Sequence, residues 1–128
     1  MDINIEEFDE VIFDFTNKVM TIVNGSIGEY GFSQIKSSNI EYEKAKYHGK
    51  KEPFYVTVRP TRLPLGMLSE TSFYVGLKVV LKNEKVLAIY VSKKKTRNNT
   101  DQHIKDTKKA KQIQKILNKI IEENKSPA

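Results

Sequence analysis

The chain has 128 residues, of which 38% are hydrophobic and 30% are charged, and its formal net charge is +6. This length suits one domain with a single core, and the composition excludes an intrinsically disordered chain. The sequence contains no cysteine, which excludes disulfides and thiolate metal sites. We therefore expect a single domain over residues 1–128 with a frayed C-terminus at residues 125–128.

The N-terminal sequence MDINIEEFDE is acidic and lacks the basic and then apolar pattern of a signal peptide. The longest apolar stretch, residues 73–81, is interrupted by Lys78 and is too short to span a bilayer. These features predict a cytoplasmic protein without membrane contact. Lysine supplies 19 of the 22 basic residues, and Ile and Asn are frequent. That bias is typical of an AT-rich genome, such as that of a low-GC bacterium, its plasmids or its phages.

The N-terminal region has the spacing of an amphipathic helix. Apolar residues recur there at steps of three and four, which predicts a helix over residues 5–23; they are Ile5, Phe8, Ile12, Phe15, Val19 and Val23. Asn4 and Glu7 are spaced as a capping box, and Asn24-Gly25 is a typical helix stop. The acidic residues of this region would then cover the outer face of the helix.

The middle of the chain has the alternation of strands. Short alternating pieces surround Tyr30, Ile40 and Phe54. The longest strand pattern is FYVGLKVVLK, residues 73–82, and a polar turn at 82–85 leads to VLAIYV. These two pieces predict a hairpin. Two segments broken by Gly and Pro, residues 48–53 and 59–66, are predicted loops.

A second amphipathic helix is predicted near the C-terminus, over about residues 106–124. Its apolar stripe contains Ala110, Ile113, Ile116, Leu117, Ile120 and Ile121. Lys108, Lys111, Lys115 and Lys119 lie nearly opposite. Ile104 falls on the lysine side, so the helix either starts after it, capped by Asp106, or starts at Thr100 and leaves Ile104 misplaced.

The order of elements predicts an α+β fold. An antiparallel sheet of about four or five strands would be flanked by the N-terminal and C-terminal amphipathic helices, because the strand-like pieces follow one another without helices between them. Both helices would cover one face of that sheet.

The positive charge is concentrated in one place. Residues 93–111, which we call the basic segment, hold eight basic and two acidic residues, whereas the rest of the chain holds 14 of each. A surface of this kind is typical of phosphate binding, and the alternative is a solvated helix face with a charged loop. The predicted contact residues are Lys93, Lys94, Lys95, Arg97, Lys105, Lys108, Lys109 and Lys111.

Two further features are candidate sites. Arg59 and Arg62 lie within a proline-containing loop, where the planar guanidinium group suits binding of phosphate or carboxylate. The alternative is a connecting loop whose leucines are buried in the core.

His48 and His103 are isolated in the sequence, so neither belongs to a metal-ligand pattern. A general acid–base role in cleaving RNA is conceivable for them, but no spacing supports it. We therefore predict no catalytic residue, no metal and no cofactor.

These observations favour a small non-catalytic binding protein that contacts nucleic acid or an acidic, nucleoprotein partner. A phage- or plasmid-encoded inhibitor or accessory factor of a nucleic-acid enzyme, such as a restriction or CRISPR nuclease, fits this description. Two alternatives stay open. One is a phage neck or tail subunit, in which the acidic N-terminal helix of one copy meets the basic segment of the next. The other is a small ribonuclease-type toxin that uses His48 or His103.

Overall fold

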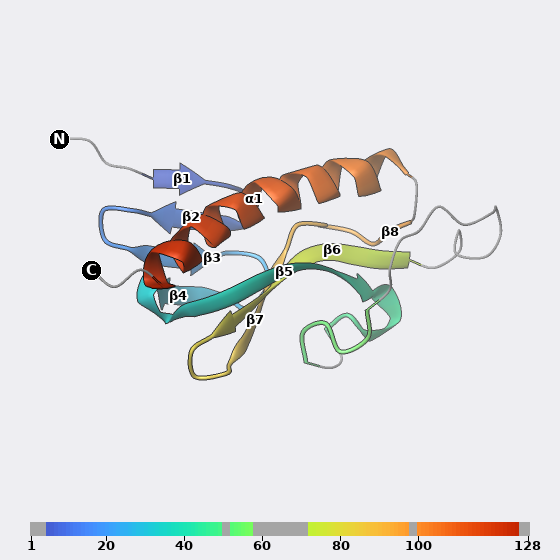
Figure 1. Ribbon diagram of the computed structural model, residues 1–128. Helices are drawn as coiled ribbons and strands as arrows, with labels where there is room; N and C mark the ends of the chain where they lie inside the picture. Colours follow the sequence, from blue (N-terminus) through green and yellow to red (C-terminus); the bar gives the residue numbers. More distant parts are fainter. Residues whose placement is uncertain (1–4, 50–51, 58–71, 98–99, 126–128) are drawn as a thin grey trace.

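The computed structural model describes residues 5–49, 52–57, 72–97 and 100–125, which form an α+β arrangement of antiparallel strands and one long helix (Figure 1). Strands β1 to β4 form one sheet in that order, and β5, β6 and β7 form a second sheet in which the short β8 also pairs with β6. The elements are β1 (Ile5–Glu7), β2 (Val11–Asp14), β3 (Val19–Ile22), β4 (Gly28–Gly31), the 3-10 helix η1 (Phe32–Gln34), β5 (Ile35–Lys44), the 3-10 helix η2 (Ala45–Tyr47), β6 (Ser72–Leu81), β7 (Val86–Tyr90), β8 (Thr96–Arg97) and α1 (Asp101–Lys125).

The predicted N-terminal helix is wrong, because residues 5–23 contain the first three strands of the first sheet. The buried side chains alternate along each strand, with Val11 and Phe13 on β2 and Met20 and Ile22 on β3. Apolar residues on three short strands happened to fall at helical spacing. Val23, which that spacing placed in the core, is 47% exposed. The acidic residues of this region therefore belong to strands and turns.

A tight turn after Asp14 explains why the chain reverses here. The Asp14 carboxylate accepts hydrogen bonds from the backbone N–H groups of Thr16 and Asn17, each at 3.0 Å. These bonds, the one from Asn17 above all, hold the pKa of Asp14 below its usual range. Lys18 adopts a positive φ of 55° and completes the reversal. The β-branched and aromatic residues on both sides favour strands, so turn chemistry outweighs the helical spacing.

The predicted hairpin in the second sheet is confirmed. β6 pairs with β7, and Glu84 supplies a positive φ of 71° in the turn between them. β5 pairs with the other side of β6 and contains Ile40 and Tyr42, as predicted. The strand predicted around Phe54 is not formed: in the described part of that segment, the pairing is an isolated bridge to β5, and Phe54 itself has a positive φ of 58°.

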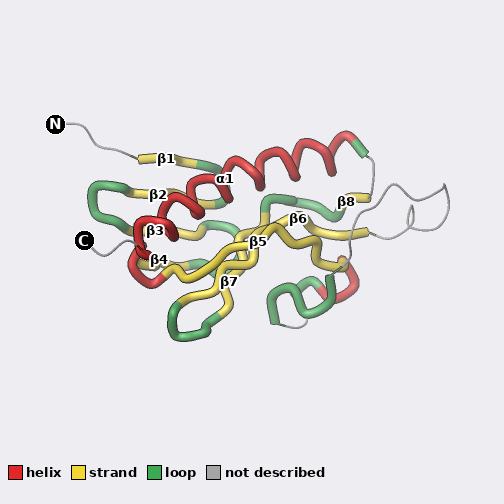
Figure 2. The backbone as a smooth tube through the Cα atoms, in the orientation of Figure 1, coloured by secondary structure: helices red, strands yellow, loops and turns green. Residues whose placement is uncertain are grey.

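The C-terminal helix is confirmed, and it has the longer of its two predicted extents. The Thr100 hydroxyl caps the start by accepting a hydrogen bond from the backbone N–H of His103 at 3.1 Å. Ile104 is consequently left 59% exposed. Figure 2 shows α1 lying across the second sheet, where it contacts β5 and β6. The buried stripe on α1 contains Ala110, Ile113, Leu117, Ile120 and Ile121.

Gly25 joins the two sheets. It bridges Ile89 on β7, and the flanking residues extend this contact through hydrogen bonds from Tyr90 N to Asn24 O at 3.0 Å and from Ser26 N to Ala88 O at 2.9 Å. Gly25 has a φ of 127°, and a Cβ atom there would lie 2.1 Å from the Ala88 carbonyl oxygen. Asn24 and Gly25 therefore belong to the contact between the two sheets, where only glycine fits at position 25. The predicted helix stop at these residues is wrong.

One cluster of buried apolar side chains joins β2 and β3 of the first sheet, β6 and β7 of the second sheet, and α1. The side chains of β6 at alternate positions from Phe73 to Leu81 point into it and are at most 2% exposed. The α+β class and the antiparallel pairing are thus confirmed. The prediction that two helices flank one sheet is wrong, because a second sheet occupies the place of the N-terminal helix.

Truncation of two side chains tests this core. Leu77 is fully buried, so Leu77→Ala should lower the free energy of unfolding by about 2–5 kcal/mol. Phe15 only packs against the edge of the cluster, and Phe15→Ala should cost less. Urea unfolding of both variants measures the two losses. A loss for Leu77→Ala below that for Phe15→Ala would contradict the described core.

Candidate functional site

Three exposed lysines bulge from the second sheet where the basic segment begins. After β7, the backbone N–H groups of Val91 and Ser92 both donate to the Val75 carbonyl of β6, at 2.9 and 3.0 Å. The chain then rejoins β6 as β8. Ser92 and Thr96 are buried at the two ends of this interruption, and the residues between them are exposed: Lys93, Lys94 and Lys95. We call these three residues the lysine bulge.

Ser92 fixes the lysine bulge to both the sheet and the helix. Its hydroxyl accepts a hydrogen bond from Val75 N at 2.9 Å and donates one to the Asp106 carboxylate at 2.7 Å. The other oxygen of Asp106 accepts a bond from the Gln102 amide at 2.7 Å. Asp106 is therefore a buried acceptor in the second turn of α1, and its predicted role as the helix cap is wrong.

The lysine bulge lines an open pocket of about 950 Å³ together with residues from β5, η2 and β6. Lys44 and Lys46 come from the end of β5 and from η2, and Tyr74 comes from the start of β6. Like charges gathered around a concave surface raise the local concentration of anions. We call this the lysine pocket; the described residues that line it, none of them acidic, are Lys44, Ala45, Lys46, Ser72, Tyr74, Lys93, Lys94 and Lys95.

Acidic residues of the N-terminal region contact part of the basic segment within the same chain. Lys93 Nζ lies 3.3 Å from an Asp9 oxygen, and the hydrogen bond and charge of Lys93 hold the pKa of Asp9 below its usual range. Lys109 Nζ lies 2.8 and 2.9 Å from the two oxygens of the buried Glu10. Lys93 and Lys109 are therefore both paired with acidic residues of the same chain. The lysine pocket adds Lys44 and Lys46, which were not predicted from the sequence.

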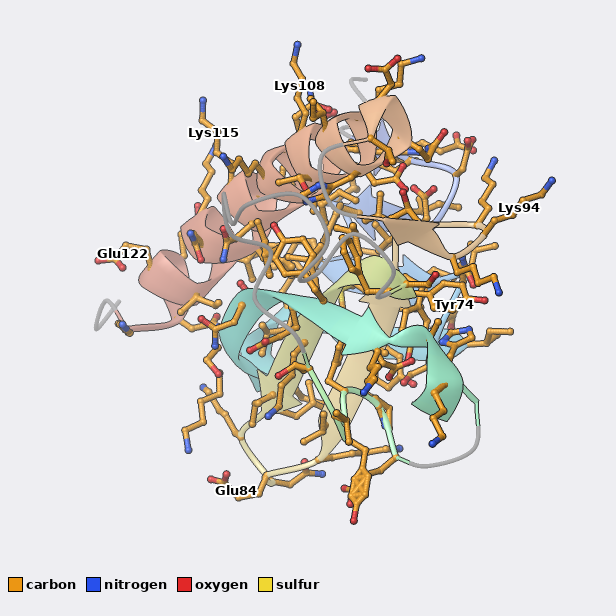
Figure 3. The ribbon with its side chains drawn as sticks, turned by 90° about the vertical axis from the view of Figure 1, so that its right-hand side faces the viewer. Tyr74, Glu84, Lys94, Lys108, Lys115 and Glu122 are labelled. Atoms are coloured by element: carbon orange, nitrogen blue, oxygen red, sulfur yellow. The ribbon has the colours of Figure 1, made fainter. Side chains whose placement is uncertain are left out.

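The other predicted contact residues fall into two groups. Lys105, Lys108 and Lys111 are exposed on α1 and do not line the lysine pocket. Figure 3 shows Lys108 projecting from the helix, away from the flank that carries Lys94 and Tyr74. Arg97 has its backbone in β8, but its side chain lies outside the described part of the chain, as do Arg59 and Arg62 and their whole loop.

A buried carboxylate organises the face of the second sheet next to the lysine pocket. Glu43 is 1% exposed, and its oxygens accept hydrogen bonds from His48 Nδ1 at 2.7 Å, from Phe54 N at 2.6 Å and from the Tyr90 hydroxyl at 2.8 Å. Burial, followed by the contact with Glu43, raises the pKa of Tyr90 well above its usual range. His48 also stacks on Tyr74, with ring centroids 3.8 Å apart.

His103 lies apart from this network. Its ring packs edge-on against Phe73 and Tyr42, with centroid separations of 5.1 and 5.7 Å. Burial lowers its pKa, and the nearby Asp106 charge opposes that shift. Among the described residues, no group of three or more His, Cys, Asp or Glu side chains is arranged to hold a metal ion. The two histidines are thus held in separate aromatic settings.

The lysines that sequence reasoning missed are Lys44 and Lys46. Tyr74 belongs to the strand tyrosines, which beside lysines could stack bases but on a strand also favour packing. The sequence EKAKY contains two lysines close to a strand end, but nothing local indicates which other segment they meet. The pairing of Lys44 with Phe73 across β5 and β6 is what brings them to Tyr74. The signal that could have found them is therefore the register of a long-range strand pair.

Comparison with known protein families, curated protein sequences and solved structures finds no match. In the described part of the chain, no helix has the length and apolar character needed to cross a membrane.

The lowered pKa of His103 predicts a pH effect on stability. Unfolding returns this imidazole to its usual pKa of about 6.5, so the unfolded chain binds the proton more tightly than the folded chain does. The His103 contribution is therefore present above about pH 6.5 and is lost as the pH falls toward the lower folded-state pKa. His103→Phe, which keeps an aromatic ring, should lose less stability than the wild type between neutral and mildly acidic pH.

Urea unfolding of both proteins at a series of pH values measures this difference. The comparison isolates His103 because the other titrating groups are shared. Parallel curves for the two proteins across that range would contradict the assignment.

Proposed function

We propose that this protein is a non-catalytic binding protein that holds nucleic acid phosphates in the lysine pocket. The observation that carries the proposal is the convergence of five lysines from two separate chain segments on one pocket, where none of the described lining residues is acidic; one of the five, Lys93, also contacts Asp9. Lysines that only keep a surface soluble need not converge. Each lysine that neutralises a phosphate releases counterions, which supplies affinity without sequence specificity.

The cellular role proposed here follows from composition and size. A lysine-rich, cysteine-free chain of this length suits an intracellular inhibitor or accessory factor carried by a phage or plasmid. Its target would be a nucleic-acid enzyme, such as a restriction or CRISPR nuclease, or the nucleoprotein complex of one. In that setting the lysine pocket would engage the nucleic acid strand that the enzyme also binds.

The assembly alternative is less well supported. It relied on an acidic N-terminal helix that could meet the basic segment of another copy. Residues 5–23 instead form strands, and Asp9 and Glu10 contact Lys93 and Lys109 of the same chain. These four side chains are thus engaged internally.

The Glu43–His48 contact favours a second candidate function, cleavage of RNA. A buried carboxylate 2.7 Å from Nδ1 orients the imidazole, and this arrangement recurs in general acid–base catalysis. The same contact has a structural role, because Glu43 also binds Phe54 N and the Tyr90 hydroxyl and so ties the 45–57 segment to the sheet. The structural role accounts for all three bonds, whereas catalysis accounts for one. We therefore retain binding as the proposed function.

Neutralising the lysines of the pocket should lower the affinity for nucleic acid, whatever the nucleotide sequence. The pocket variant replaces four lysines by Gln and leaves Lys93 in place because it contacts Asp9; the four are Lys44, Lys46, Lys94 and Lys95. The slope of log affinity against log salt should flatten by about 0.7–0.9 for each phosphate that the variant no longer neutralises. Stability should change by less than about 0.5 kcal/mol for each lysine, because Lys46, Lys94 and Lys95 are exposed, Lys44 is partly exposed, and surface substitutions contribute little to folding.

The matched control removes the same charge from α1. It replaces four exposed lysines by Gln: Lys108, Lys111, Lys115 and Lys119. Fluorescence anisotropy over a range of salt concentrations compares the two variants with the wild type. The proposal requires the pocket variant to lose more affinity and more salt slope than the helix variant. Equal losses would indicate a non-specific charge effect, and a larger loss in the helix variant would move the binding surface to α1.

Absence of catalysis is tested directly with RNA. Wild-type protein incubated with labelled single-stranded RNA should produce no cleavage fragments above background. His48→Ala and His103→Ala, separately and together, should give the same result. Fragments that appear with the wild type and disappear with His48→Ala, at unchanged RNA affinity, would establish the ribonuclease alternative.

A further inference from the structure

Tyr74 is the aromatic residue of the lysine pocket, and it lies on the same flank as Lys94 (Figure 3). On β6 its neighbours Phe73 and Val75 point into the core, so the Tyr74 side chain emerges on the other face of the sheet. The ring is partly exposed. The pocket therefore presents an apolar, planar surface among its cationic groups.

The Tyr74 ring is held in place by a chain of contacts. His48 stacks on one of its faces with an interplanar angle of 19°, and Tyr90 packs edge-on at 6.4 Å. His48 is itself held by its 2.7 Å hydrogen bond to Glu43. Among the described ring contacts, His48 is the one that stacks on Tyr74. A ring fixed in this way loses little conformational entropy when a ligand stacks on it.

Gly76 leaves space on β6 for the rings of Phe54 and Tyr90, and Tyr90 lies next to Tyr74 and His48. A Cβ atom there would lie 2.7 Å from the Ile89 carbonyl oxygen and 3.0 Å from the Phe54 ring. The absence of a side chain lets Phe54 and Tyr90 pack together over β6, with ring centroids 5.5 Å apart. The aromatic group behind Tyr74 is consequently part of the folded sheet and does not depend on a ligand to form.

We propose that the lysine pocket binds single-stranded nucleic acid, with an unpaired base stacked on Tyr74 while the lysines contact the flanking phosphates. This inference rests on the proposed function and narrows its ligand class. Aromatic side chains within a cationic groove are the common means of binding single strands, because every base has a π-face and stacking tolerates any sequence. In a duplex both faces of each base are already stacked, so a ring recessed in a pocket cannot reach them. A pocket of about 950 Å³ is large enough for a nucleotide.

The experiment compares a single strand of about 12 nucleotides with the duplex of the same sequence, by fluorescence anisotropy at fixed salt. Tyr74→Leu should weaken single-strand binding by about 5- to 150-fold and leave duplex binding within about two-fold. Tyr74→Phe keeps the stacked ring and should retain most of the single-strand affinity. Tyr55→Leu is the control, because Tyr55 is 53% exposed and does not line the pocket.

A spectroscopic readout separates stacking from charge. The chain contains no tryptophan, so Tyr74→Trp introduces a single indole at the pocket. Its fluorescence should be quenched by the single strand and not by inorganic polyphosphate, which has phosphates but no bases. This test stands even if Tyr74→Leu fails to fold, which circular dichroism would reveal.

The outcomes distinguish the two proposals. If neutralising the pocket lysines changes neither oligonucleotide nor polyphosphate binding, the proposed function itself is wrong. If the lysines matter but the single strand leaves the indole unquenched, phosphate binding stands and base stacking is overturned. Tyr74→Leu with equal losses for single strand and duplex would overturn base stacking in the same way.

Discussion

The buried Ser92 hydroxyl is the contact on which the arrangement of the site depends. It accepts a hydrogen bond from Val75 N on β6 and donates one to Asp106 on α1, so a single oxygen ties the central strand of the second sheet to the helix. Because Ser92 is fixed on one side and Thr96 on the other, the three lysines between them must project outward. A buried polar group left without its partners costs about 1–3 kcal/mol, which favours the arrangement in which Ser92 keeps both bonds.

The acidic and basic regions, which are separate in the sequence, contact each other in the fold. In the sequence, an acidic end and a basic segment look like two separate surfaces. In the fold, Asp9 and Glu10 lie against Lys93 and Lys109, and this contact fixes the N-terminal sheet against α1. The cationic surface of the fold therefore differs from the one that the sequence emphasises. Lysines from β5 and η2 line the same pocket as the lysine bulge, and Lys93 and Lys109 contact Asp9 and Glu10.

The sequence was sufficient for elements whose pattern is long and unambiguous. The ten-residue strand β6, its hairpin with β7 and the apolar stripe of α1 could each be predicted from spacing alone. Residues 5–23 could not, because their apolar residues fit helical spacing as well as strand alternation, and the turn bonds of Asp14 decided between them. Only one of the segments that form the lysine pocket could be predicted. The lysine bulge was evident from charge density, but Lys44 and Tyr74 reach it through a long-range strand register that no local pattern encodes.

The central claim is that chain segments distant in sequence act as one anion-binding pocket. The most direct measurement is a backbone amide NMR titration of the wild-type protein with a short single-stranded oligonucleotide. Residues 44–46, 72–74 and 93–95 should shift together, with one apparent affinity, while residues 108–119 of α1 should change little. Shifts confined to α1, or shifts at 93–95 without any at 44–46, would show that these segments do not form one binding pocket.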